Sequence, residues 1–280
     1  MKFTVLIVFI NLLPQLVHAN GDVEKYVFQA RDESNCSDLN IEMSEWYKKR
    51  QSGVRVEAPL NEKIGRVRNQ GSIGWCFAYA AADMLSHGSG YNISAAQIAK
   101  NYLNKSKVAW IWGGAEGGLI DDAIDLSLKI PLCDEGGFSS IGLNIESANK
   151  KICENPVAVF SEYKTKKQVS TGLNAGGSTF QFLDNILAKG KIAGIHYNAN
   201  KFFKGEKSNI RNSWANHAST IVARFYNRTT STCNYLIRNS WGSSCTMLNN
   251  PKVTCFDGYY AAPEEVLNDS LNEVIELKKR

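Results

Sequence analysis

The chain has 280 residues, of which 44% are hydrophobic and 21% are charged, an ordinary composition for a globular protein. This length allows one large domain or two closely packed halves around a buried core. The net charge is only +5 and no basic run is interleaved with aromatic residues, so the composition does not favour nucleic acid as a partner.

The first residues have the pattern of a secretory leader. Lys2 supplies the positive end, residues 3–13 form the apolar stretch, and residues 17–19 place the short side chains of Val17 and Ala19 before the expected cut. The apolar stretch is much shorter than the roughly 20 residues that span a membrane. We therefore expect residues 1–19 to be a signal peptide, with no membrane association after cleavage. The expected location is secreted, lysosome-like or vacuole-like, or periplasmic.

The cysteines indicate at least one unpaired thiol. An exported chain meets oxidising conditions, in which thiols pair, and an odd number of them leaves one over. Because no C-x-x-C pair occurs, a thiolate zinc site is not expected, and we predict neither a metal nor a cofactor. The seven cysteines are Cys36, Cys76, Cys133, Cys153, Cys233, Cys245 and Cys255.

The order of the expected elements suggests two unlike halves. Residues 20–59 are polar and weakly periodic, typical of an N-terminal extension or a short prosegment. Residues 60–175 are expected to be helical, with helices at 76–87, 92–103 and 119–128. Residues 176–280 are expected to be rich in strands, with one helix at 179–189, strands at 192–197, 219–225 and 235–238, and a tail from 263 whose end looks helical. This order predicts an α+β fold.

Two further patterns do not indicate a binding site. The glycine cluster at 113–118 lacks the spacing, the lysine and the serine of a nucleotide-binding loop. Asp121, Asp122 and Asp125 are expected to form a solvated face of their helix.

Cys76 is the strongest candidate for a reactive thiol. It opens a helix-forming run directly after a glycine-rich turn. A helix N-terminus carries partial positive charge, which favours a thiolate. A catalytic thiol also needs a base and donors for the oxyanion. The competing interpretation is a buried structural cysteine.

Four segments, in chain order, resemble the motifs of papain-like cysteine peptidases. Residues 70–78 resemble the active-site segment and residues 117–123 the substrate-binding Gly-Gly segment. Residues 216–219 resemble the histidine segment and residues 238–242 the asparagine segment. The resemblance implies a two-lobed fold, with a helical left lobe, a β-barrel-like right lobe and the active-site cleft between them.

The resemblance also implies a role for each matching residue. Cys76 is the nucleophile, His217 the general base and acid, and Asn239 the residue that orients the imidazole. Gln70 donates to the oxyanion together with the backbone N–H of Cys76. The implied substrate-binding residues are Gly117, Gly118, Leu119, Ile120, Ala218 and Trp241. Of these, Leu119, Ile120 and Ala218 line an apolar pocket, which predicts Leu, Val or Phe at the second residue before the cut. Trp241 also shields the His–Asn hydrogen bond from water.

The other two histidines beyond the leader fit the role of base poorly. His87 lies on the same helix as Cys76, about 16 Å further along at 1.5 Å per residue. His196 lies in a strand-like run and is interpreted as an ordinary strand residue.

The chain departs from the family pattern next to the nucleophile. Trp75 precedes and Phe77 follows Cys76, where the family has a small residue and a Trp. Ile73 and Ala115 stand where the family has two cysteines that form a disulfide. We expect the side chains of Ile73 and Ala115 to pack together in place of that bond. No long helical inhibitory prosegment fits into residues 20–59.

A free Cys76 leaves six cysteines for three disulfides. Residues 249–251 read as a turn between Cys245 and Cys255, so these two are expected to pair. Cys133–Cys153 and Cys36–Cys233 are then the remaining pairs by elimination.

The predicted function is a secreted peptidase that hydrolyses peptide or protein substrates through a thioester on Cys76, and that a protein inhibitor could bind. One alternative is a transpeptidase or ligase, in which an amine replaces water as the acceptor. Another is a non-catalytic binding protein on the same fold. Such a protein usually loses the cysteine, the histidine or the glutamine, and this chain has all three.

Overall fold

The computed structural model describes residues 36–106, 117–157, 160–170, 176–206 and 216–280. The leader and Ala115 lie outside these ranges, so the structure does not test the leader or the Ile73–Ala115 contact. The described helices are α1 (Ile41–Gln51), α2 (Leu60–Ile64), α3 (Cys76–Ser89), α4 (Ala95–Lys105), α6 (Ile120–Ser127), α7 (Ile145–Lys150), α8 (Gly176–Leu187), α9 (Ala199–Lys204) and α10 (Glu264–Ser270). The strands are β1 (Tyr163–Val169), β2 (Ala193–Tyr197), β3 (His217–Asn227), β4 (Thr232–Arg238), β5 (Thr254–Phe256), β6 (Tyr259–Pro263) and β7 (Leu271–Lys279).

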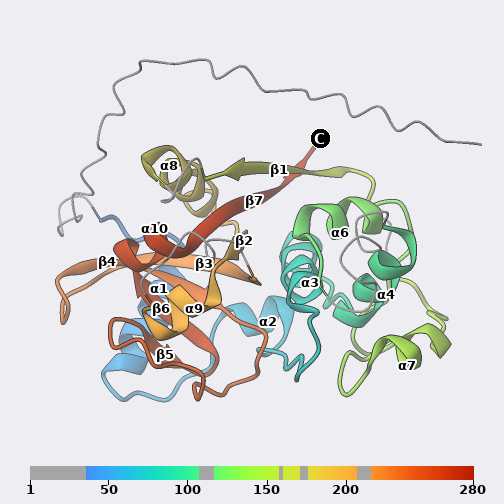
Figure 1. Ribbon diagram of the computed structural model, residues 1–280, viewed down its shortest axis with the longest axis horizontal. Helices are drawn as coiled ribbons and strands as arrows, with labels where there is room; N and C mark the ends of the chain where they lie inside the picture. The colour runs from blue at the N-terminus through green and yellow to red at the C-terminus, as the bar shows by residue number, and fades with distance from the viewer. Residues whose placement is uncertain (1–35, 107–116, 158–159, 171–175, 207–215) are drawn as a thin grey trace, which may run out of the picture.

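Helices and sheet occupy different sides of the molecule, which confirms the α+β prediction. Helices α3, α4, α6 and α7 gather on one side, and the sheet lies on the other (Figure 1). Helix α3 is the element between them, because it contacts α4 and α6 as well as β3. It is rich in alanine, a strong helix former, and its residues 77–86 are all buried. It ends at Gly90, whose φ of 80° is the left-handed conformation that glycine adopts easily.

The strands form one antiparallel sheet in the order β1-β7-β2-β3-β4-β6-β5. In this register Tyr197 pairs with His217, and His196 with Ala218. Strands β1 and β5 are its two edges, and no pairing joins them within the described residues. The sheet is therefore open there, without the barrel closure that the resemblance implied.

The end of the chain is a strand, so the expectation of a helical end is wrong. Helix α10 stops at Ser270, and β7 then inserts between β1 and β2. Leu271, Val274 and Ile275 have helix-like spacing, which misled the prediction. Val274 and Ile275 point to opposite faces of the strand and are both fully buried. Burial on both faces removes the alternation that marks a strand in sequence.

Residues 36–59 are part of the folded body. Met43, Trp46 and Tyr47 of α1 are buried, and α1 packs on β3. The Cys36–Cys233 disulfide attaches this segment to β4. The other two disulfides are Cys133–Cys153 and Cys245–Cys255, and Cys76 is free. All three predicted pairs are therefore confirmed. Within the described ranges, no helix is both long and apolar enough to span a bilayer.

Candidate active site

Cys76 is the first residue of α3 and is half-buried. No side chain caps this end of the helix, and its first turn holds no acidic residue. The N–H groups at the start of a helix have no partner within the helix. Two of them, on Cys76 itself and on Phe77, lower the pKa of the thiol, as does the backbone of Ala218. The sulfur therefore lies against the residue that follows His217.

His217 is held in one orientation by Asn239. His217 begins β3, and Asn239 follows the end of β4. The distance from His217 Nε2 to Asn239 Oδ1 is 2.8 Å. An amide oxygen only accepts, so Nε2 carries the hydrogen and the lone pair of the neutral ring is on Nδ1. Ser219 Oγ donates to the same Asn239 oxygen at 3.2 Å, which fixes the amide further.

Aromatic rings surround the imidazole of His217. Trp241 stacks on it, with ring centroids 4.6 Å apart and planes at 27°. Tyr197 and Phe203 contact it edge-on at 5.4 and 6.1 Å. The Phe203 and Trp241 rings also contact each other, at 5.0 Å. This cage leaves His217 only 6% exposed.

Burial acts on the charges of both candidate catalytic groups. It raises the pKa of the Cys76 thiol to about 11, against the effect of the backbone N–H groups. It lowers the pKa of His217 to about 4, against the effect of the hydrogen bond to Asn239. Each charge taken singly is thus disfavoured. Moving the proton from Cys76 to His217 adds no net charge, so forming the two charges together costs less than forming either one alone.

Gln70 lies beside this site, next to an isolated antiparallel bridge between Asn69 and Trp241. Gln70 N–H donates to the carbonyl of Ser240, and Gly242 N–H to that of Arg68. Gln70 Nε2 donates to the carbonyl of Ile73, two residues before the helix N-cap. A primary amide nitrogen has two hydrogens, so this bond leaves one for an oxyanion.

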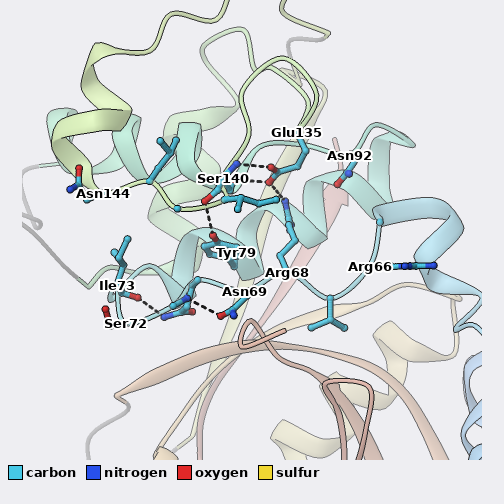
Figure 2. Close-up of a pocket in the computed structure, with 17 residues that line it drawn as sticks. Arg66, Arg68, Asn69, Ser72, Ile73, Tyr79, Asn92, Glu135, Ser140 and Asn144 are labelled. Atoms are coloured by element: carbon cyan, nitrogen blue, oxygen red, sulfur yellow. Dashed lines mark hydrogen bonds and ion pairs between the residues drawn. The ribbon is translucent and has the colours of Figure 1, made fainter. Parts of the chain in front are cut away.

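A cavity of about 740 Å³ is lined by Gln70 and its neighbours in the chain (Figure 2). Residues 65–73 form one wall, and the opposite wall includes residues 140–144. Cys76, His217 and Asn239 do not line it. It therefore does not bear on the assignment of these three residues.

The Gly-Gly segment is fastened close to the nucleophile. Gly117 has a φ of 91°, and its N–H donates to the carbonyl of Gly74. A Cβ at Gly118 would lie 2.6 Å from the Tyr102 ring and 2.8 Å from the Phe77 ring. Only glycine fits without displacing these rings. The Gly117–Gly74 bond also connects the two chain segments that the family joins by a disulfide.

The remaining implied pocket residues lie deeper. Leu119 is partly exposed, whereas Ile120 and Ala218 are 0% and 1% exposed. Ile120 N–H donates to His196 Nε2 at 3.1 Å, so His196 is a buried, hydrogen-bonded strand residue.

The expected solvated aspartate face is wrong for Asp121 and correct for Asp125. Asp125 is exposed, but Asp121 is 7% exposed and binds the ammonium group of Lys167 at 2.7 Å. That group also lies 3.3 Å from Glu273. The reason is that β1, which carries Lys167, packs on α6.

Asp121, His196 and Glu273 form the one described cluster whose ligand atoms are close enough for a metal ion. Lys167 already supplies a cation between the two carboxylates, and the Ile120 amide occupies His196 Nε2. We therefore assign no metal to this cluster.

Sequence reasoning missed the polar residues behind the site. Asp83, on the same helix as Cys76, forms ion pairs with Arg68 and with Arg238, which directly precedes Asn239. Two signals were present: Asp83 is the only charged residue in the apolar run 76–85, and Arg238 directly precedes Asn239. A lone charge in a buried helix requires a partner.

Comparisons with known proteins identify the fold. No protein-family model and no curated protein matches the chain. Digestive procathepsin L 3 from the larval midgut of Tenebrio molitor superposes with a TM-score of 0.54 at 13% identity, over 85% of this chain and 88% of that one. Xylellain, a cysteine protease from Xylella fastidiosa, gives 0.52 at 20% identity, over 77% and 83%. The ragweed pollen allergen Amb a 11, a cysteine protease in its proform, gives 0.52 at 14% identity, over 91% and 67%. At these identities the likeness shows a shared fold, and the chain has the papain-like fold.

Proposed function

We propose that this chain is a cysteine peptidase that hydrolyses peptide bonds through a thioester on Cys76. The observation that carries the proposal is the His217–Asn239 hydrogen bond. This bond leaves Nδ1 as the basic atom of the His217 ring. The next residue, Ala218, contacts the Cys76 thiol through its backbone. A nucleophile, a base and an orienting amide from three separate elements form the arrangement that acyl transfer requires.

The proposed reaction proceeds in two stages. Cys76 sulfur attacks the carbonyl carbon of the substrate, and the thiol proton is held by His217. The oxyanion accepts hydrogen bonds from the backbone N–H of Cys76 and from Gln70 Nε2. The C–N bond then breaks, and His217 gives its proton to the leaving amine. Water, deprotonated by His217, attacks the thioester, and the proton returns to the departing thiol.

The first experiment tests this assignment by substitution. The Cys76→Ala and His217→Ala variants should lose peptidase activity, while both remain folded by circular dichroism. Mass spectrometry after treatment with a thiol-directed peptidyl epoxide should show one adduct on Cys76. Full activity in Cys76→Ala would contradict the proposal. Binding of peptides without turnover by the unaltered protein would favour the binding-protein alternative.

Product analysis separates hydrolysis from transpeptidation. With an added primary amine, a hydrolase should release mainly the free carboxylate. A dominant amide product would favour the ligase alternative, because the same acyl-enzyme then reacts with nitrogen instead of water.

We further propose that Gly117, Gly118 and Leu119 contact the substrate, with Ile120 and Ala218 behind them and Trp241 beside the base. Lys167 already binds the carboxylates of Asp121 and Glu273, which lie near these residues. An apolar pocket disfavours an unpaired charge. A peptide library should therefore show Leu, Val or Phe at the second residue before the cut. Selection of Arg or Asp there would refute the pocket assignment.

We also propose that the protein is exported after cleavage of residues 1–19. Its three disulfides fit an oxidising compartment. N-terminal sequencing of the protein recovered from its natural host should begin at Asn20 or further along the chain. A mature protein that retains Lys2 would contradict this.

A further inference from the structure

The three proposed catalytic segments converge on a single buried carboxylate. Asp83 lies seven residues after Cys76 on α3, which is close to two helical turns and places both on one face of the helix. Asp83 Oδ1 accepts from Arg68 Nη2 at 2.6 Å, and Oδ2 accepts from Arg238 Nε at 2.9 Å. Asp83 is only 5% exposed.

Each arginine is next to a proposed catalytic residue in the chain. Arg68 stands two residues before Gln70, and its carbonyl accepts from Gly242 N–H. Arg238 directly precedes Asn239. The carboxylate therefore connects the nucleophile helix, the oxyanion segment and the asparagine segment in one contact.

Arg238 is held rigidly in this contact. Besides Asp83, it donates to the carbonyls of Gly65 and Arg66 at 3.0 and 2.9 Å. Its remaining donor atom binds the hydroxyl of Tyr259 and the amide oxygen of Asn61. A guanidinium has five N–H donors, and these contacts use all five. Its side chain is 0% exposed.

The Nη1 end of Arg68, which does not contact Asp83, is also held by hydrogen bonds. Its Nη1 donates to Glu135 at 2.7 Å and to the carbonyl of Ile93 at the same distance. Its guanidinium lies 5.5 Å from the centroid of the Tyr79 ring. Figure 2 shows Arg68 and Glu135 side by side in the cavity wall, with Glu135 bonded in turn to Ser140. Two cations thus face two carboxylates in one network, which is buried at Asp83 and Arg238 and partly exposed at Arg68 and Glu135.

We propose that Asp83 is a positioning residue that sets the relative placement of Cys76, Gln70 and Asn239. This inference rests on the proposed peptidase function. A misplacement of about 1 Å between reacting groups costs much of their catalytic effect, so the anchor of three segments acts on turnover rather than on substrate binding. Removing the carboxylate leaves the fully buried Arg238 guanidinium without its anionic partner and leaves Arg68 paired with Glu135 alone, so the segments next to the two arginines shift apart.

The test compares two isosteric variants, Asp83→Asn and Asp184→Asn. Asp184 also pairs with a buried arginine, Arg224, and accepts from Tyr235. Arg224 lies seven residues along β3 from His217, about 23 Å away at 3.3 Å per residue. Both variants should lower the melting temperature. Only Asp83→Asn should lower kcat, by tenfold or more, with KM changed less than threefold.

A second variant keeps the inference testable if the Asp83→Asn protein does not fold. Glu135→Gln weakens the brace on Arg68 and leaves the Asp83–Arg238 pair intact, so its loss of kcat should be smaller, about two- to fivefold. Unchanged kcat in folded Asp83→Asn, or an equal loss of kcat in Asp184→Asn, would overturn the inference. If the unaltered protein cleaves no peptide, it is the proposed peptidase function that fails, a result distinct from either of these.

Discussion

At the scale of single residues, the charge state of Cys76 and His217 decides the chemistry. Burial raises the pKa of the thiol and lowers that of the imidazole. The partial charge at the start of α3 acts in the opposite direction, and so does the proposed pairing of the two groups. Two opposite unit charges about 4 Å apart attract each other by about 4 kcal/mol at an effective dielectric constant of about 20, and this attraction favours the proposed ion pair.

The first prediction follows from this balance. We expect iodoacetamide to alkylate Cys76 well below pH 7, because the thiolate forms together with the imidazolium. The rate should be measured from pH 4 to pH 10. In His217→Ala the thiolate loses its partner, and reactivity should move to the alkaline range. A rate in the unaltered protein that rises only toward pH 11 would mean that burial prevails and that the thiolate forms only during attack.

The second prediction concerns Trp241, which stacks on the imidazole of His217. Removing the ring admits water to the His–Asn hydrogen bond and frees the imidazole to rotate. An aromatic contact contributes about 0.5–1.5 kcal/mol, which corresponds to roughly a two- to tenfold loss of kcat in Trp241→Ala. Trp241→Phe keeps a ring over the imidazole and should retain most of the rate. Equal losses in both variants would rule out shielding by the ring.

At the scale of elements, the sequence predicts α3 correctly as a helix but does not predict β7 as a strand. Helix α3 is determined by its own residues, since alanine and leucine favour helix and Gly90 ends it. Strand β7 depends on β1 and β2, to which its two edges are bonded. The apolar residues of β7 have helix-like spacing, but the segment forms a strand because it pairs with β1 and β2 and both of its faces are covered.

The third prediction tests the position of β7. Ile275 is fully buried in an internal strand, so Ile275→Ala should lower the free energy of unfolding by about 2–5 kcal/mol. Lys278→Ala, three residues further on at an exposed position, should change it by less than about 0.5 kcal/mol. Urea unfolding of both variants provides the comparison. Similar small changes would mean that this tail does not pack as an internal strand.

At the scale of the whole molecule, buried histidines make stability depend on pH. Burial lowers the pKa of both His196 and His217 to about 4, from an unfolded value of 6.5. Between these values the unfolded chain binds protons that the folded chain does not. The free energy of unfolding therefore rises with pH through this window and falls as the pH drops toward 4. Glu273, whose pKa is raised by burial, acts in the opposite direction.

The fourth prediction is the size of this effect. Each histidine should contribute about 3 kcal/mol between pH 4 and pH 6.5. In His196→Gln, which keeps an acceptor for the Ile120 amide, the pH dependence should fall by about half. Denaturant unfolding at several pH values measures it. An unchanged slope in the variant would show that His196 does not titrate on unfolding.

Much of the candidate site could be predicted from the sequence. The segments around Gln70, Cys76, His217 and Asn239 are short, and each has a distinctive run of neighbours. Leaving one cysteine free and placing a turn between Cys245 and Cys255 predicted one disulfide. The other four cysteines can pair in three ways, and the structure confirms the choice of Cys133–Cys153 and Cys36–Cys233. Helices such as α3 could be predicted because helical hydrogen bonds join residues only four apart.

The tertiary structure alone decided which charges are buried and which strands pair. Asp121 and Asp125 share one helix, yet only Asp121 meets Lys167, which β1 brings from 46 residues away along the chain. Asp83 binds Arg238 across 155 residues. Strand β7 reaches β1 across more than 100 residues. Propensity and periodicity describe only neighbouring residues, and these contacts exist because folding brings distant segments together, so no local pattern contains them.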